Sequence, residues 1–506
     1  MTTQADQEAV LAFLGKRAER IDTHISILFL EPDRVLKIKR AVRLPFLDFS
    51  TLDKREHACD EEIAVNKPNA PAIYRRVVPI TRGSLGFQIG GDGEVVEWAV
   101  EMTRFDERQT LDHLVRRGDI SAELAEALAD TMLASHRGAA ISDGASWLAS
   151  IAGLIDRNSD EFRKQTCLAA SDIARLDAAS HRQLAEHLGL MKRRATAGLV
   201  RRCHGDAHLG NIVAIDNKPV LFDAIEFDPV IATTDILYDL AFPLMDLVHF
   251  SQGVAASRLF NRYLQETWPQ NADALKLLPL FLSIRSAIRA HVLFTRHEQS
   301  ARDVAALAQA QSYFNLALRL IAPERPSLIA IGGRSGTGKT VLARDVAAAL
   351  EPAPGAAVLR TDVIRKQMFD VDPLTALPET AYTLEVNERV YRTMFARGET
   401  ILKQGLSVIL DAAFLAEDER KQLPALASSC GASFCGLFLD APSNIRLQRI
   451  AARKRDASDA KHDVALLQEG FDIGKLDWPI VDASGSPQDT LTRAMALLGR
   501  LRKDTE

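Results

Sequence analysis

The 506-residue chain contains little cysteine, no excess of basic residues and no long uncharged apolar run. Its five cysteines form no C-x-x-C pair, so the sequence predicts reduced thiols and a cytoplasmic protein. The 62 lysines and arginines are outnumbered by 67 acidic residues, and the net charge of −5 argues against a protein that coats nucleic acid. The most apolar stretch, residues 236–250, is interrupted by Asp239 and Asp246, so we expect no membrane span.

The composition is that of a globular chain with more than one domain. Hydrophobic residues make up 47% and charged residues 25%, and the length is too great for one compact core. A helical pattern over about residues 302–320 is ended by Pro323 and Pro326. An apolar run and a glycine cluster follow directly, as at the start of a new domain. We therefore expect a first domain over residues 1–322 and a second over residues 323–506.

The first domain divides into a small mixed lobe and a helical lobe. Strand-like stretches occur at residues 25–30, 35–38, 77–80 and 95–100. From about residue 110 to 200, and again from 235 to 321, the apolar spacing is mainly helical. This pattern predicts a small α+β lobe over about residues 1–102 and a helical lobe over about residues 103–322.

The strongest single motif lies in the second domain. Residues 333–340 fit the phosphate-binding pattern G-x-x-x-x-G-K-[ST], between a strand-like run and a helical one. Such a loop curls backbone amides around phosphate oxygens, Lys339 neutralises the β- and γ-phosphates, and the Thr340 hydroxyl coordinates Mg²⁺. The residues expected to hold ATP are Gly333, Ser335, Gly336, Thr337, Gly338, Lys339 and Thr340.

Acidic and basic residues follow the later strands of this domain. Strand-like runs at 357–359 and 407–410 lead to Asp362 and Asp411, which we expect at the ligand-binding edge of a parallel sheet. Asp362 is a candidate base, although a helix N-cap would also place an aspartate there. A third strand-like run, 433–439, precedes a helical stretch at 443–455 that carries four arginines. These arginines are candidates for a lid that neutralises charge on the transferred phosphoryl group, or they form one solvated face of the helix.

This second domain resembles the small P-loop kinases, including gluconate kinases, zeta-type toxins and the 5′-kinase domain of polynucleotide kinases. Beside the phosphate loop, the resemblance rests on D-x-x-R at Asp362 and Arg365 and on R-x-x-x-R at Arg449 and Arg453. It implies that Asp362 activates the acceptor, that Arg365 holds it and that Arg453 is the lid arginine. Asp411 resembles a Walker B metal ligand. The next residue is an alanine rather than a second acid, which favours transfer to an organic acceptor.

A second phosphotransfer pattern lies in the first domain. Residues 204–211 read H-G-D-x-x-x-x-N, and a strand-like run later ends in Asp223. Asp206 can accept a proton, while Asn211 and Asp223 can hold Mg²⁺. Upstream, Lys37 on a strand can contact the phosphates. Glu62, or the adjacent Glu61, can orient it by an ion pair. The alternative interpretations are that Lys37 is a solvated strand lysine and that Asp206 and Asn211 belong to a capped turn between strands.

This arrangement resembles the aminoglycoside phosphotransferase and choline kinase family, a relative of the protein kinases. The resemblance covers about residues 20–320 and implies a bilobal kinase-like fold. It also implies structural roles for Asp235 and Asp239 and an adenine-contacting hinge near residues 97–102. The sequence departs from the family at one point, since residues 24–34 contain no glycine where a phosphate-clamping loop would lie.

The order of the two domains resembles a bacterial fusion of such a kinase with a P-loop kinase. The resemblance implies an α/β and α+β multidomain chain that uses ATP and Mg²⁺ to phosphorylate small hydroxyl compounds. Two alternatives stay open: the first domain is an inactive sensor that regulates the second, or the chain phosphorylates nucleic-acid 5′ ends. The acidic charge argues against nucleic-acid partners. We expect no membrane partner, and the sequence leaves the oligomeric state open.

Overall fold

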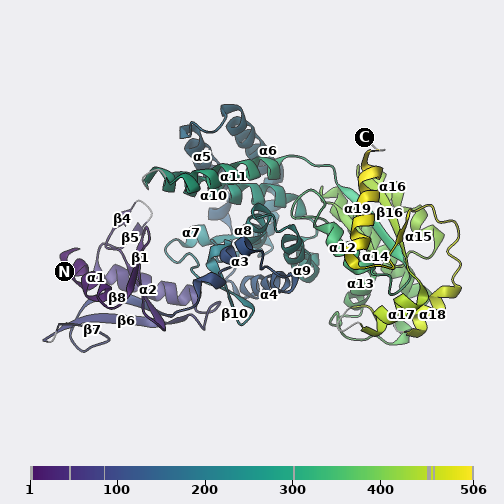
Figure 1. The fold of residues 1–506 in the computed structure, drawn as a ribbon. Coiled ribbons are helices and arrows are strands. Elements are labelled where there is room, and N and C mark those ends of the chain that lie inside the picture. The colour runs from purple at the N-terminus through teal and green to yellow at the C-terminus, as the bar shows by residue number, and fades with distance from the viewer. Residues whose placement is uncertain are drawn as a thin grey trace. The chain divides into compact units, whose positions relative to one another are not determined.

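The computed structural model describes residues 4–44, 47–84, 86–299, 303–452, 457–459 and 462–503. Backbone contacts divide the chain into two compact units (Figure 1). The N-terminal unit comprises residues 1–250 and 284–314, and the C-terminal unit comprises residues 251–283 and 315–506. The domain boundary predicted near 322–327 differs from this division, because helix α9 (Gly253–Asn271) groups with the C-terminal unit.

An antiparallel sheet of order β1-β2-β3-β8-β6-β7 forms the first part of the N-terminal unit. Its strands are β1 (Glu19–Asp22), β2 (Ser26–Leu30), β3 (Arg34–Lys39), β6 (Tyr74–Gly83), β7 (Gly86–Ile89) and β8 (Glu94–Thr103). The helices beside it are α1 (Gln4–Gly15) and α2 (Leu52–Asn66), and a short β4–β5 ladder pairs Arg43–Leu44 with Leu47–Asp48. The strand-like stretches of the small lobe are thus confirmed as β2, β3, β6 and β8.

The alternation of side chains along β3 decides where its lysines lie. Leu36 and Ile38 pack against α1 in one apolar cluster. Val35 belongs to the cluster that includes Cys59 of α2. Because successive side chains of a strand point to opposite faces, Lys37 and Lys39 share the α2 face with Val35. The apolar pattern of this strand therefore turns both ammonium groups toward the helix.

Helices and two short ladders make up the rest of the N-terminal unit. The helices are α3 (Leu111–Arg117), α4 (Ala122–Gly138), α5 (Ala145–Lys164), α6 (Ala170–Thr196), α7 (Pro229–Ala232) and α8 (Ile236–His249), and α10 (Leu278–Gln299) and α11 (Val304–Ile321) cross between the units. The ladders pair β9 (Val200–Arg202) with β12 (Thr233–Asp235) and β10 (Ile212–Ile215) with β11 (Lys218–Leu221). One described stretch, Leu275–Gln299, is long and apolar enough to cross a membrane. However, 72% of its most apolar window is buried inside the protein, as in a core helix.

A five-stranded parallel sheet of order β14-β15-β13-β16-β17 forms the core of the C-terminal unit. The strands are β13 (Ser327–Gly333), β14 (Ala357–Arg360), β15 (Val408–Asp411), β16 (Ser433–Asp440) and β17 (Ile480–Asp482). All seven residues of β13 are buried, as expected for a strand covered on both faces. The three strands predicted after the phosphate loop are confirmed as β14, β15 and β16.

Helices of the C-terminal unit surround this sheet. They are α12 (Lys339–Ala347), α13 (Thr361–Met368), α14 (Leu384–Lys403), α15 (Glu417–Lys421), α16 (Leu423–Ser429), α17 (Ser443–Ala452), α18 (His462–Leu467) and α19 (Pro487–Lys503). Leu342 and Val346 of α12 share one apolar cluster with Ala494 and Leu498 of α19 and with the sheet. The unit is therefore α/β, which confirms the fold class predicted for the two parts of the chain.

Helix α9 is joined to the edge strand of this sheet by one side chain. Nδ2 of Asn261 donates to the carbonyl of Ala356 at 3.0 Å, and Oδ1 accepts from the amide of Val358 at 2.7 Å. An amide side chain thus satisfies the backbone groups of β14 as a further strand would. Gln265 of α9 also accepts, through its carbonyl, a 3.1 Å hydrogen bond from Gln367 of α13.

We expect Asn261→Ala to lower the free energy of unfolding of the C-terminal unit by about 1–3 kcal/mol, because it leaves a donor and an acceptor of β14 without partners. Chemical denaturation of the full chain, followed by circular dichroism, measures the change. Val254→Ala, on the same helix and half-exposed, is the matched control. Identical unfolding midpoints for the Asn261 variant and the wild type would contradict this role.

Candidate functional site

A buried ion-pair network forms around the lysine predicted to contact phosphates. Nζ of Lys37 lies 2.9 Å from Oε1 of Glu62 on α2 and 2.5 Å from Oδ1 of Asp223, which follows β11. Glu61 instead lies 3.8 Å from Arg202. The structure therefore brings Glu62, and not its neighbour, to the lysine. Three residues from separate motifs meet at one point.

The network extends to two residues that the sequence analysis did not single out. Oε2 of Glu62 lies 2.6 Å from Nζ of Lys39, which also pairs with Glu226. Burial disfavours the charge on Lys37, but the carboxylates of Asp223 and Glu62 outweigh it and raise the pKa of the lysine well above its ordinary value. The two-residue spacing of Lys37 and Lys39 on one strand was the signal that could have found the second lysine.

Asp223 is held in a conformation that side chains seldom adopt. Its φ of 61° lies in the left-handed region, and its amide donates to the hydroxyl of Tyr74 at 3.1 Å. The next residue, Ala224, is fixed by Asn66 of α2, whose Oδ1 accepts from the Ala224 amide at 2.7 Å. This strain is held at the residue predicted to bind metal, as is common at functional sites. The Asp223 carboxylate is about half exposed, and so is accessible to a ligand.

Asp206 and Asn211 lie together in the loop between β9 and β10. Nδ2 of Asn211 donates to the carbonyl of Asp206 at 3.0 Å and to its Oδ2 at 3.2 Å. Two buried carboxylates hold this loop from behind. Asp239 accepts from the amide of Gly205 at 2.9 Å, and Asp246 accepts from the amide of Leu209 at 3.0 Å. The structural role predicted by resemblance for Asp239 corresponds to this contact.

Burial raises the pKa of Asp206 to about 6, although the nearby charges of His204 and Arg289 oppose the shift. A carboxyl group with this pKa is mainly ionised at pH 7 and still accepts protons readily, which suits a general base. Asp239 shows the opposite balance. Burial opposes its charge, but the hydrogen bond from His136 lowers its pKa to about 2.

The turn between β1 and β2, where a phosphate-clamping loop would lie, is closed by its own hydrogen bonds. The amide of Thr23 donates to the carbonyl of Ser26 at 2.9 Å, and the amide of Ser26 donates to Oγ1 of Thr23 at 3.0 Å. Nε of Arg40 donates to the carbonyl of Thr23 at 2.9 Å. The amides of Thr23 and Ser26 are therefore already hydrogen-bonded within the turn. The segment that lacks glycine thus also lacks these two amides as donors to phosphate.

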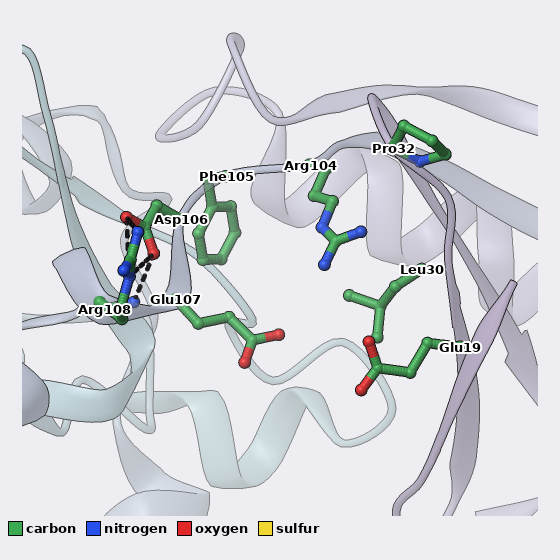
Figure 2. Close-up of a pocket in the computed structure, with 8 residues that line it drawn as sticks. All are labelled: Glu19, Leu30, Pro32, Arg104, Phe105, Asp106, Glu107 and Arg108. Atoms are coloured by element: carbon green, nitrogen blue, oxygen red, sulfur yellow. Dashed lines mark hydrogen bonds and ion pairs between the residues drawn. The ribbon is translucent and has the colours of Figure 1, made fainter.

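A cavity of about 450 Å³ lies where this sheet meets the segment after β8. It is lined by Glu19, Leu30, Pro32 and residues 104–108, and Figure 2 shows the Glu19 and Glu107 carboxylates facing the same space as Arg104. Phe105, which lines the cavity, packs edge to face on Phe222, the residue before Asp223, with ring centres 5.0 Å apart. Residues 97–102, where the hinge was expected, lie inside β8. The connection between the lobes begins instead after Thr103.

The phosphate loop of the C-terminal unit connects β13 to α12. Gly336 and Gly338 have φ values of 86° and 93°, and a Cβ at Gly336 would lie 2.6 Å from the carbonyl oxygen of Arg446. Glycine is therefore required there on both counts. Nζ of Lys339 donates to the carbonyl of Arg334 at 3.1 Å, so the lysine reaches back across the loop that it is predicted to serve.

Asp411 and Asp362 lie at the same edge of the parallel sheet. Oδ2 of Asp411 accepts from the hydroxyl of Thr340 at 2.6 Å and lies 3.4 Å from Nε of Arg360. Burial raises the pKa of Asp362, and the charges of Arg360 and Lys339 oppose the shift. The two carboxylates predicted as base and metal ligand therefore share an environment with two cations. Arg360 is a member that the motif search did not identify.

The predicted arginines have different surroundings. Arg365 is buried: it donates to the carbonyl of Ala381 at 2.8 Å and to Oδ1 of Asn387 at 2.7 Å, and stacks on the ring of Tyr382. Arg449 donates to the carbonyls of residues 483 and 485, at 2.8 and 2.6 Å. Arg453, the predicted lid arginine, lies outside the described residues.

Segment 468–469 covers part of the phosphate loop and was missed by the sequence analysis. Oε1 of Gln468 accepts from the amide of Ser335 at 2.7 Å, and its carbonyl accepts from Nε of Arg334 at 3.1 Å. Glu469 pairs with Arg446, whose NH1 donates to the carbonyl of Ser335 at 3.2 Å. A side-chain amide thus bonds to one backbone group of the loop predicted to bind phosphate. No short motif signals such a contact.

Comparison with known proteins identifies the C-terminal part. The family model described as an AAA domain matches residues 328–469. Uncharacterized proteins of Mycobacterium tuberculosis and Mycobacterium bovis are each 26% identical over 453 residues, which is 88% of this chain and 88% of theirs. The family match covers the P-loop domain that the sequence predicts.

Three solved structures show partial similarity. A gluconokinase from Sinorhizobium meliloti is 20% identical, covering 36% of this chain and 97% of its own, with a TM-score of 0.27. A choline/ethanolamine kinase family protein from Mesorhizobium loti is 12% identical, covering 63% and 98%, with a TM-score of 0.35. Aminoglycoside 2′-phosphotransferase-IIIa is also 12% identical, covering 63% and 99%, with a TM-score of 0.37.

The sheet order and catalytic loop described above give the N-terminal unit the bilobal kinase-like fold that was predicted.

We expect Lys339→Ala to weaken binding of an ATP analogue at the P-loop roughly 100-fold, or about 2.7 kcal/mol, because the ammonium group on the phosphates is lost. Calorimetry of the full chain with magnesium should show the stoichiometry falling from two to one. Lys403→Ala, an exposed lysine on α14, is the matched control. Unchanged stoichiometry and affinity in the Lys339 variant would argue against a nucleotide at this loop.

A pH profile tests Asp206 as the base. Because its pKa is about 6, the reactive carboxylate is lost as pH falls through that value. In the Lys339→Ala background, kcat/KM of the N-terminal site should be constant above about pH 7 and fall roughly tenfold per pH unit below about pH 5. ADP release measured from pH 4.5 to 8 gives the profile. A flat profile across that range is incompatible with this base.

Proposed function

We propose that the chain is an ATP-dependent phosphotransferase with two nucleotide sites, each of which transfers the γ-phosphate to the hydroxyl group of a small molecule. The observation that carries the proposal is that each unit places a lysine and oxygen ligands at one site. In the N-terminal unit these are Lys37 and Asp223, 2.5 Å apart. In the C-terminal unit Lys339 begins α12, and Thr340 beside it contacts Asp411.

In the N-terminal site, each side chain has a distinct part in the transfer. The ammonium group of Lys37, held by Glu62, binds the α- and β-phosphates, and the cavity lined by Glu19 and Glu107 is positioned for the nucleoside. The acceptor oxygen forms a bond to the γ-phosphorus, the bond to the bridging oxygen of ADP breaks, and Asp206 takes the hydroxyl proton. Preorganisation comes from the Asn211 and Gly205 contacts to this loop.

In the C-terminal site, the backbone of residues 333–340 surrounds the phosphates and Lys339 neutralises their charge. Asp362 accepts the proton of the acceptor hydroxyl, and its raised pKa suits a base. Arg365 is already bonded to Ala381 and Asn387, so it shapes the acceptor pocket through the segment around Tyr382.

The oxygen ligands at both sites suit Mg²⁺. Asn211 uses its Nδ2 on Asp206, so its Oδ1 can serve with the carboxylate of Asp223 as a ligand, and Thr340 and Asp411 offer a hydroxyl and a carboxylate oxygen 2.6 Å apart. When bound at these residues, the ion neutralises charge on the β- and γ-phosphates. We further propose a cytoplasmic protein with small-molecule acceptors and without nucleic-acid or membrane partners.

A second candidate function has a specific observation in its favour. The β1–β2 turn bonds to itself through Thr23 and Ser26, so the amides of these two residues are not offered to the phosphates. This feature suits a nucleotide-binding sensor that does not transfer phosphate and that regulates the C-terminal kinase. The two functions differ in whether Asp206 is needed for turnover.

Variants of the full chain separate the two functions. With a metabolite pool as acceptor, we expect Asp206→Asn and Lys339→Ala each to lower ADP release by abolishing one of two activities, and the double variant to lose both. Asp160→Asn, an exposed aspartate on α5, controls for the change of charge. If Asp206→Asn keeps full turnover while Lys339→Ala has none, the N-terminal unit is the sensor and not a kinase.

A further inference from the structure

Two arginines of α10 lie near the proposed base of the N-terminal site. Arg285 and Arg289 are four residues apart, and so lie on one face of the helix. The charges of both act on the carboxyl group of Asp206. The surroundings of this base therefore contain two guanidinium groups that no motif in the sequence indicated.

Arg285 holds the catalytic loop through its Nε and NH1, while its NH2 makes no hydrogen bond among the described residues and lies 3.9 Å from Oδ1 of Asp239. It donates to the carbonyl of Gly205 at 3.1 Å and to that of Tyr238 at 3.2 Å. Its guanidinium group lies over the rings of Tyr238 and Phe242, 3.9 and 4.5 Å from their centres. This arginine therefore positions the residue that precedes Asp206.

Arg289 has a different environment. Its Nε is buried and makes no hydrogen bond among the described residues. It lies beside Tyr313 and Asp246, but one Asp246 oxygen accepts from the Tyr313 hydroxyl at 2.9 Å and the other from the Leu209 amide at 3.0 Å. The nearby carboxylate thus has strong partners of its own. Arg289 is hydrogen-bonded to the side chain of Tyr313, and its Nε retains donor capacity for a ligand.

His208 lies close to Asp206 and is affected by the charge of Arg289. Its Nε2 lies 3.7 Å from Oδ2 of Asp206. Burial, and then the charge of Arg289, lower the pKa of His208 to about 4, so the ring is neutral at pH 7. The fixed cations that act on the base therefore include Arg289 beside Arg285, and His208 adds only a neutral polar edge.

The described carboxylates around the loop offer little to a cationic acceptor. Asp239 is bonded to His136 and to the amide of Gly205, and Asp223 is paired with Lys37. Asp112 on α3 accepts from the hydroxyl of Thr110 at 2.6 Å and lies 3.4 Å from His113. An ammonium group would therefore meet Arg289 with no unengaged carboxylate except the base itself, whereas an anion would supply an acceptor for the unpartnered Nε of Arg289.

We propose that the N-terminal site binds an acceptor that carries an anionic group, a phosphate or a carboxylate, near its reacting hydroxyl, and that Arg289 binds this anion. The inference rests on the proposed function only in naming Asp206 as the base. Arg289 neither gives nor takes a proton. It sets the orientation in which the hydroxyl oxygen attacks the γ-phosphorus while the proton passes to Asp206. It is a specificity-determining residue.

The experiment measures acceptor binding separately from transfer. In the full chain with Lys339→Ala, calorimetry compares four probes: glycerol 3-phosphate, glycerate, uncharged glycerol, and the amine 2-amino-1,3-propanediol. We expect at least one anion to bind more than tenfold more tightly than glycerol and the amine. Arg289→Gln should weaken that anion more than tenfold, while Arg289→Lys should stay within about threefold of the parent. Arg296→Gln, an exposed arginine on the same helix, should have no effect.

The outcomes have separate meanings. The proposal is overturned if the Arg289→Gln variant binds the anion as tightly as its Lys339→Ala parent does. It is also overturned if the amine binds more tightly than the anions, or if neither anion binds measurably. Because Arg289→Lys keeps the charge, its retained affinity excludes misfolding as the cause, and thermal unfolding checks Arg289→Gln directly. Absence of phosphoryl transfer with anion binding intact would refute the proposed function and leave this inference standing. Comparing the two anions distinguishes a phosphate from a carboxylate.

Discussion

Burial of charge is the constraint on which the N-terminal unit depends. Lys39 and Glu62 are fully buried, and isolated charges in such a place would be very costly. They are tolerated because Glu62 bridges Lys37 and Lys39 while Glu226 and Asp223 complete the pairing. The network joins β3, α2 and the segment after β11. Removing one member would leave a buried charge with fewer partners, so the site and the fold are specified by the same contacts.

The C-terminal unit meets its main constraint at a sheet edge. A parallel sheet must be covered on both faces, and its outermost strand still presents unpaired backbone groups. Asn261 satisfies the amide of Val358 on β14 and the carbonyl of Ala356 just before it, from a helix that ends more than fifty residues before β13 begins. Residue Gln367, two positions after Arg365, contacts that same helix. The segment that carries the proposed base of this site is therefore supported by chain from outside the P-loop motif.

Much of both sites could be predicted because their chemistry fixes residue types at fixed spacings. The phosphate loop, Asp206 with Asn211, and the order of Lys37, Glu62 and Asp223 are all local signals of this kind. Lys39, Arg289 and Gln468 were missed because each acquires its significance only through a contact distant in sequence. The hinge implied by resemblance near residues 97–102 falls inside β8, because the resemblance does not mark where that strand ends. The grouping of α9 depends on contacts distant in sequence, such as those of Asn261 and Gln265, which no periodicity reveals.

The contact between Gln468 and Ser335 has a thermodynamic consequence. The backbone amide of Ser335 already donates to Oε1 of Gln468. A phosphate oxygen that binds this amide therefore replaces one hydrogen-bond acceptor with another and does not satisfy an unpaired donor. The net gain from this amide is therefore only the difference between a charged and a neutral acceptor. Weakly charged ligands gain almost nothing from the exchange, whereas a polyphosphate gains a charge-assisted bond. The side chain of Gln468 thus competes with the ligand for the Ser335 amide, and only a strongly charged ligand gains from displacing it.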